Sequence, residues 1–361
     1  MTDAPARAAG AVSADPTGAG ATVGSLGEDA LIARVTGRFA PLPDRVEVGP
    51  GDDAAVVRPP RGALEAITTD ALIAGVHFDF AICSAGDVGH KALAVNLSDL
   101  ASMGATPRGM TLSLGLPASW PLVELDALAG AMAALAGAHG VALVGGNISE
   151  SPRDLFVDVT AWGDVKRRGV LTRSGGRPGD LLVVTGRIGQ GAAGLAWLRA
   201  NRQSDDPGPA AQCVAWYRRP EPRVRVGQLL AKTRTARASI DLSDGLARGV
   251  EQLATASGCG ATIDAERLPM GEAASTVFRS IGRDPLQAAV AGGDDYELLF
   301  AVPPRERRQL AALRKIARGV ELTEIGRLTK DAGVALVRDG EPQPWPTGFA
   351  HFAGGQGRSD T

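Results

Sequence analysis

The stretch KALAVNLSDLASMGATPR (Lys91–Arg108) carries one charged residue, Asp99, between its two basic ends. At 3.6 residues per turn it predicts a helix that is apolar nearly all round, which is typical of a buried helix. A buried, ionised carboxylate is costly unless a cation or several hydrogen-bond donors compensate it, and no Lys or Arg lies within helical reach of Asp99. We therefore expect Asp99 to meet either the backbone N–H groups of a neighbouring loop or a metal ion.

The composition of the chain excludes several classes of protein. With 361 residues, 44% hydrophobic and 22% charged, it is long enough for two domains that each have a core. A formal charge of −2 and scattered basic residues argue against a general nucleic-acid binder. Three widely spaced cysteines fit a reducing cytoplasm, and no run reaches transmembrane length. We expect a cytoplasmic protein without nucleic-acid or membrane partners.

The order of the elements predicts a two-domain α/β (α+β) fold. Residues 1–24 are small and polar without an apolar signal-peptide core, so we expect a disordered extension there. The basic, Gly/Pro-rich connection from residue 166 marks the boundary between domains at 25–165 and 166–352, with a flexible tail at 353–361. Helices are expected at 27–40, 91–104, 122–139, 224–232 and 305–318, and strands at 46–48, 54–57, 64–70, 111–116, 141–144, 155–165, 180–185, 261–263, 298–302 and 333–338.

Short polar sites flanked by glycines or hydroxyls recur along the chain. They are GDD (51–53), TTD (68–70), NLSD (96–99), GGN (145–147), DLSD (241–244) and GGDD (292–295). Any one of them is more often a turn or a helix cap than a ligand site. Together they supply carboxylate, hydroxyl and amide oxygens without a His/Cys cluster, which is the preference of Mg²⁺ and not of zinc or iron. Several Mg²⁺ ions suit a polyphosphate, so we expect Mg–nucleotide phosphoryl chemistry.

A separate glycine pattern points weakly to a dinucleotide. Gly189, Gly191 and Gly194 match G-x-G-x-x-G between an expected strand and helix. No acidic residue ends a second strand about twenty positions later, because the next acids lie in the polar loop NRQSDDPGP. The G-K-[ST] of a Walker A loop is also missing from the sequence.

The longer motifs resemble those of the thiamine-monophosphate kinases, members of the aminoimidazole-ribonucleotide-synthetase-like ATP-binding superfamily. The resemblance covers about residues 25–352 and rests on GDDAAVV, TTDALIAGVHF, KALAVNLSDLASMGA, GGN, GVLTRSG, IDLSDGL and GGDDYELLF. It implies an N-terminal mixed β-sheet domain that forms the interface of a homodimer, and a C-terminal α/β domain. It also implies Mg²⁺-dependent phosphorylation of thiamine monophosphate by ATP, giving thiamine diphosphate.

The resemblance implies roles for individual residues. The implied Mg²⁺ ligands are Asp53, Thr68, Thr69, Asp70, Asp99, Asn147, Asp241 and Asp244. The implied ATP contacts are Gly146, Asn147, Arg173 and Ser243, and the implied thiamine-phosphate contacts are His77, Asp294 and Phe349. Asn147 stands where many relatives have Asp, and Asp294 where they often have Glu. An amide oxygen still ligates Mg²⁺ but brings no charge, and the shorter Asp294 could reach the substrate through water.

No catalytic general base is expected for this reaction. A phosphate monoester has a second pKa of about 6 and is already anionic at neutral pH, so positioning and charge neutralisation would carry catalysis. Two alternatives remain at the level of the sequence. One is another ATP-using member of the superfamily, similar to aminoimidazole ribonucleotide synthetase, and the other is a non-catalytic regulator that binds Mg–nucleotide.

Overall fold

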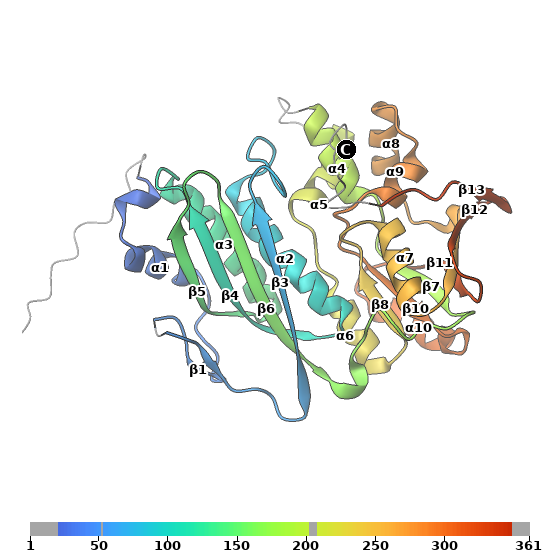
Figure 1. Ribbon diagram of the computed structural model, residues 1–361, viewed down its shortest axis with the longest axis horizontal. Coiled ribbons are helices and arrows are strands. Elements are labelled where there is room, and N and C mark those ends of the chain that lie inside the picture. Colours follow the sequence, from blue (N-terminus) through green and yellow to red (C-terminus); the bar gives the residue numbers. More distant parts are fainter. Residues whose placement is uncertain (1–20, 52, 202–207, 349–361) are drawn as a thin grey trace, which may run out of the picture.

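The fold has two halves, each built on a β-sheet, with a long helix between them (Figure 1). A computed structural model describes residues 21–51, 53–201 and 208–348. The N-terminal half holds helix α1 (Glu28–Thr36), the small hairpin of β1 (Val46–Val48) and β2 (Val56–Val57), and a four-stranded sheet ordered β3-β6-β4-β5. Its strands are β3 (Ala63–Ile73), β4 (Thr106–Leu116), β5 (Ala142–Glu150) and β6 (Phe156–Lys166), and its long helices are α2 (Ala85–Ser102) and α3 (Leu122–His139).

The four-stranded sheet has one packed face and one open face. Buried and half-exposed side chains alternate along β6, as expected of a strand with one face on a core. Strands β3 and β4 both pair with β6 antiparallel, whereas β5 pairs with β4 in parallel because α3 forms the crossover between them. Helices α2 and α3 cover the packed face, so successive residues of β3 point to different environments.

The C-terminal half is built on a seven-stranded sheet ordered β13-β12-β9-β11-β7-β10-β8. Its strands are β7 (Leu181–Thr185), β8 (Ala238–Asp241), β9 (Gly260–Asp264), β10 (Leu298–Val302), β11 (Leu322–Thr329), β12 (Val334–Arg338) and β13 (Glu341–Gln343). The helices are α4 (Gln190–Ala200), α5 (Ala211–Arg218), α6 (Val224–Thr233), α7 (Leu246–Ala256), α8 (Glu272–Ser280), α9 (Pro285–Ala291) and α10 (Arg307–Ile316).

Helix α2 is the element that the two halves share. Every residue of it is buried except His90 and Asp99, which confirms the buried helix predicted from its apolar circumference. It contacts β3, β6 and α3 on the N-terminal side, and α6 and β8 on the C-terminal side. Close approach depends on glycine: a Cβ on Gly227 of α6 would lie 2.0 Å from the carbonyl oxygen of Ala101.

Several elements differ from the sequence-based expectation. The GGN stretch is no turn, because β5 continues through it to Glu150 and pairs with β4. The segment after β9, which has no regular pattern in sequence, contains α8 and α9. Strand β11 was not predicted although it lies inside the sheet; a register shift between Glu324 and Gly326 interrupts its alternation. Part of the stretch 1–24, expected as a disordered extension, is structured, since Val23 is buried and its N–H donates to the carbonyl of Trp120. Residues 1–20 lie outside the described residues.

Helix α3 is the one described helix that is long and apolar enough, by length and composition, to cross a membrane. In this fold it packs along α2, and its buried side chains belong to the core of the N-terminal half.

Candidate active site

A cavity of about 810 Å³ lies where the two halves meet at α2. The N-terminal half contributes the end of β3, the turn after it and one side of α2. The C-terminal half contributes the loop after β8 and the segment between α9 and β10. The cavity brings together eight of the residues singled out in the sequence: Asp70, His77, Asp99, Arg173, Asp241, Ser243, Asp244 and Asp294.

Three carboxylates converge in this cavity from three different elements. Asp70 projects from β3, Asp99 from α2 and Asp241 from the end of β8. The hydroxyl of Thr68 donates to Asp99 Oδ2, and the hydroxyl of Ser98, one residue before Asp99, donates to Asp241 Oδ2 at 2.8 Å. The NLSD motif therefore holds one carboxylate itself and orients another from the opposite half.

Burial and mutual repulsion disfavour the ionised forms of these carboxylates. Burial, then the charge of Asp99, raises the pKa of Asp241 to about 7. Burial and Asp99 likewise raise the pKa of Asp70 to about 7. Burial also raises the pKa of Asp99, and hydrogen bonds from Thr68 and Asp70 oppose it only in part. A cation placed among the three groups would relieve this cost.

The donor set fits magnesium held jointly with phosphate. Among the residues that the structure describes, no group of three or more His, Cys, Asp or Glu side chains could by itself hold a metal ion. Mg²⁺ is usually bound through one or two carboxylates, with waters and substrate phosphates completing its octahedron. Arg173 lines the same cavity and its charge acts on both Asp99 and Asp241. Crowded carboxylates beside a guanidinium suit a Mg–polyphosphate.

The raised pKa values predict a pH dependence of stability for the ligand-free protein. The pKa of Asp241 is about 7 in the folded state and about 3.8 in the unfolded state, so the folded state keeps this proton up to a higher pH. Stability should thus fall as pH rises from about 4 to about 7, and then level off. Between pH 5 and pH 8, we expect Tm of the wild type to fall about 3 °C further than Tm of Asp241→Asn in calorimetry without Mg²⁺. Parallel curves for the two proteins would contradict this coupling.

The other predicted site residues lie elsewhere. Asp53, Gly146 and Asn147 line a second cavity of about 710 Å³ on the open face of the four-stranded sheet. Thr69 also points to that face, where its hydroxyl contacts Asp158 and Thr160. Strand alternation separates Thr69 from its neighbours Thr68 and Asp70, which face α2. Phe349 lies outside the described residues.

Comparisons with known proteins show the family of this chain. Residues 51–165 match the family "AIR synthase related protein, N-terminal domain", and residues 177–339 match the corresponding C-terminal domain. The thiamine-monophosphate kinase of Escherichia coli (strain K12) is 40% identical over 336 residues, which cover 91% of this chain and 99% of that protein. The chain belongs to the thiamine-monophosphate kinase family.

Solved structures of this kinase family have the same fold. The crystal structure of thiamine-monophosphate kinase from Stenotrophomonas maltophilia K279a is similar with a TM-score of 0.75 and 36% identity, covering 87% of this chain and 96% of that one. A structure of AaThiL complexed with AMPPCP and TMP is similar with a TM-score of 0.72 and 30% identity, covering 81% and 89%.

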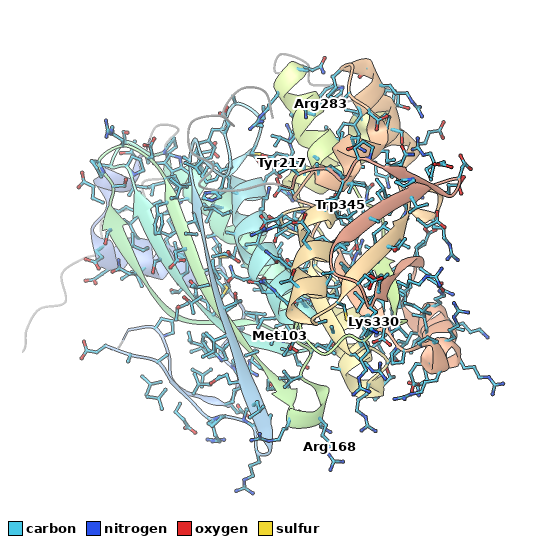
Figure 2. All side chains as sticks on the ribbon, turned by 45° about the vertical axis from the view of Figure 1, so that its right-hand side comes forward. Met103, Arg168, Tyr217, Arg283, Lys330 and Trp345 are labelled. Atoms are coloured by element: carbon cyan, nitrogen blue, oxygen red, sulfur yellow. The ribbon has the colours of Figure 1, made fainter. Side chains whose placement is uncertain are left out.

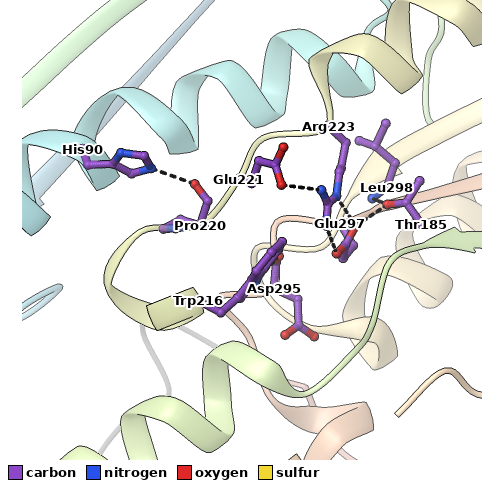
Figure 3. A network of polar contacts seen from close by, with 9 residues as sticks. All are labelled: His90, Thr185, Trp216, Pro220, Glu221, Arg223, Asp295, Glu297 and Leu298. Carbon is purple, nitrogen blue, oxygen red and sulfur yellow. Dashed lines mark hydrogen bonds and ion pairs between the residues drawn. The ribbon is translucent and has the colours of Figure 1, made fainter. Parts of the chain in front are cut away.

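The glycine pattern of this thiamine-monophosphate kinase family member binds a carboxylate of its own chain. The N–H groups of Gly189 and Gly191 donate to the two oxygens of Asp295 at 2.6 and 3.1 Å. Asp295 is fully buried, and the indole of Trp216 donates to its carbonyl oxygen (Figure 3). The backbone donors that a dinucleotide phosphate would need at the start of α4 are thus used internally. This explains why the pattern occurs without the acidic ribose-binding residue.

Sequence reasoning missed part of the cavity wall. Lys91 is the first residue of the stretch 91–108. It lies about one helical turn before Val95 and two turns before Asp99, and all three side chains line the cavity. The i, i+4, i+8 spacing could have identified it. Tyr217 and Arg199 also line the cavity, but they lie near the ends of α5 and α4, outside every motif found in the sequence. Only the packing of α4 on α5, and of α5 against α2, reveals them.

Proposed function

We propose that this protein transfers the γ-phosphoryl group of ATP directly to thiamine monophosphate and so forms thiamine diphosphate. Family membership at 40% identity over nearly the whole chain supports this activity. The single observation that carries it in this structure is the convergence of Asp70, Asp99 and Asp241, from both halves, in one cavity. The similar AaThiL structure is complexed with AMPPCP and TMP, which supports ATP and thiamine monophosphate as the two substrates.

The residues of the cavity have separate tasks in this proposal. Asp70, Asp99 and Asp241 would hold Mg²⁺, with Thr68 and Asp244 beside them. When bound, the ions would neutralise the charge of two phosphate groups that otherwise repel each other. Arg173 and Ser243 would contact ATP, and His77 and Asp294 would contact the acceptor. The acceptor phosphate is already an anion at neutral pH, so in-line positioning replaces proton removal.

We further propose roles for the predicted residues on the open face of the sheet, in a homodimer. Asp53, Thr69 and Asn147 would ligate Mg²⁺ there, and Gly146 and Asn147 would contact ATP. That face carries exposed apolar side chains, Ile67 among them at 67% exposure, which suits an interface. We also propose the domain limits 25–165 and 166–352 and a cytoplasmic location. The flexible tail at 353–361 and the substrate contact of Phe349 stay predictions, because these residues lie outside the described part of the chain.

Mass spectrometry of the reaction products tests the activity. Purified protein with ATP, Mg²⁺ and thiamine monophosphate should yield equal amounts of ADP and thiamine diphosphate. Parallel reactions with formylglycinamidine ribonucleotide, the acceptor of aminoimidazole ribonucleotide synthetase, should yield no ADP. ATP consumption with the second acceptor only would overturn the assignment. Binding of ATP without turnover of either acceptor would favour the regulator.

A further inference from the structure

Lys91 is a buried ammonium group in the cavity wall that the proposed mechanism does not use. Its side chain is 6% exposed, and Nζ lies 3.0 Å from Asp294 Oδ1 and 4.2 Å from the ring centre of Tyr217. Nζ has no partner of hydrogen-bond geometry among the described residues, so the contact with Asp294 is an ion pair only. Burying an ammonium group is costly unless its charge is paired, so the carboxylate of Asp294 is what compensates the charge of Lys91 here.

The polar contacts of the Asp294 side chain that the structure describes all involve one of its two carboxylate oxygens. The hydroxyl of Tyr296 donates to Oδ1 at 2.9 Å, and Lys91 approaches the same atom. In the described part of the chain, no donor reaches Oδ2, and the side chain is 28% exposed toward the cavity. Asp294 therefore presents one anchored oxygen to the protein and one free acceptor to a ligand.

The backbone fixes this orientation as well. Asp294 and Tyr296 both have positive φ, 65° and 50°, which is uncommon for residues other than glycine and is kept where the surroundings enforce it. The N–H of Asp294 donates to the carbonyl of Ser243, and the N–H of Tyr296 donates to the carbonyl of Leu242. The loop is thus tied to the DLSD segment, which carries Asp241 and Asp244.

We propose that Lys91 is a positioning residue, which holds Asp294 so that its free oxygen accepts a hydrogen bond from the aminopyrimidine amino group of the acceptor. This inference rests on the proposed function. The acceptor has three distinct parts: an anionic phosphate, a thiazolium cation without an N–H, and the aminopyrimidine. A carboxylate repels the phosphate, and Lys91 already compensates its charge, which weakens its attraction for the thiazolium. The amino group remains as the donor that fits.

The spacing along α2 agrees with this placement. Lys91 and Asp99 are eight residues apart, so they are separated by about 12 Å along the helix axis. An acceptor with its phosphate beside Asp99 and its two rings extended along α2 would bring the amino group toward the Lys91 end. The aromatic side chains of Tyr217 and Tyr296 line that end.

The test compares two acceptors in steady-state kinetics: thiamine monophosphate, and its analogue in which oxygen replaces the pyrimidine amino group. The wild type should prefer the amino compound in kcat/KM by at least about tenfold, since the analogue cannot donate to Asp294. Lys91→Met should reduce this preference to about threefold or less, and raise KM for thiamine monophosphate while KM for ATP stays unchanged. Asp294→Asn should shift the preference toward the oxo analogue, because an amide can donate to it.

Further variants separate positioning from a general structural effect. If Lys91 acts through Asp294, the double variant should be no worse than Asp294→Asn alone, so the two effects are not additive. Tyr296→Phe, which removes the other anchor of Oδ1, should lower the preference in the same direction. Lys330→Met serves as the control, since Lys330 is exposed and well separated from Tyr217 (Figure 2).

Two results would overturn the inference alone. One is an unchanged preference in Lys91→Met, and the other is an equal rise of KM for ATP, which would make Lys91 a contact to the nucleotide. Failure of the wild type to phosphorylate either acceptor would instead overturn the proposed function, and this inference with it.

Discussion

Asp99→Asn should lower kcat/KM for thiamine monophosphate about a thousandfold. The substitution removes a negative charge that would hold Mg²⁺, and with it several kcal/mol of transition-state stabilisation by the metal. The same variant should not lose stability without ligand. The raised pKa of Asp99 means that its ionised form is disfavoured in the folded state at neutral pH, and the neutral amide removes that cost. Kinetics at saturating Mg²⁺, together with calorimetry at pH 8 without Mg²⁺, measure the two effects separately.

This variant is informative because it should lose activity without losing stability. A residue needed only for packing would lose stability and activity together. Asp331→Asn, at an exposed position that is not part of the cavity lining, should leave both unchanged. A wild-type rate in Asp99→Asn at saturating Mg²⁺ would remove Asp99 from the metal site.

Arg223→Met should destabilise the protein by about 3–5 kcal/mol, because it leaves a buried carboxylate without its partner. Glu297 is fully buried and accepts two hydrogen bonds of 2.7 Å from Arg223, and the hydroxyl of Thr185 donates to it as well (Figure 3). Burial lowers the pKa of Arg223, but the bonds to Glu297 outweigh it and raise the pKa. Urea unfolding measures the loss.

Two further variants identify the cause of that loss. Arg305→Met breaks an exposed pair with Glu306 and should change stability by no more than about 0.5 kcal/mol. Replacing both members of the buried pair, with Arg223→Met and Glu297→Leu together, should recover part of the stability, since no unpaired charge remains. Equal losses in the single and double variants would show that packing, and not charge pairing, dominates at this position.

Much of the fold could be predicted from local patterns. The apolar circumference of α2 predicted its burial, and the bounds expected for α3 are those observed, with Gly140 in the left-handed conformation after its last residue. Strand β11 could not be found in this way, because a register shift disturbs its alternation and its burial depends on β7 and β9. The GGN stretch misled for a related reason: Gly146 allows a close approach to the backbone of Leu112 in β4, and the stretch does not mark a turn.

The site was less predictable than the fold. Motifs supplied the carboxylates, but sequence alone could not show that strand alternation puts Thr69 and Thr68 on different faces of one sheet. Nor could it show that adjacent acids in GGDD have different partners, with Asp294 facing Lys91 and Asp295 facing the start of α4. Such partners come from distant elements, and only the packed structure brings them together.

The shared helix α2 also determines how cooperatively the protein unfolds. Because nearly its whole circumference is buried against one half or the other, neither half can lose its structure without exposing apolar surface of the other. A chain with two sheets and two family domains is therefore expected to melt as a single cooperative unit, with its calorimetric and van't Hoff enthalpies equal.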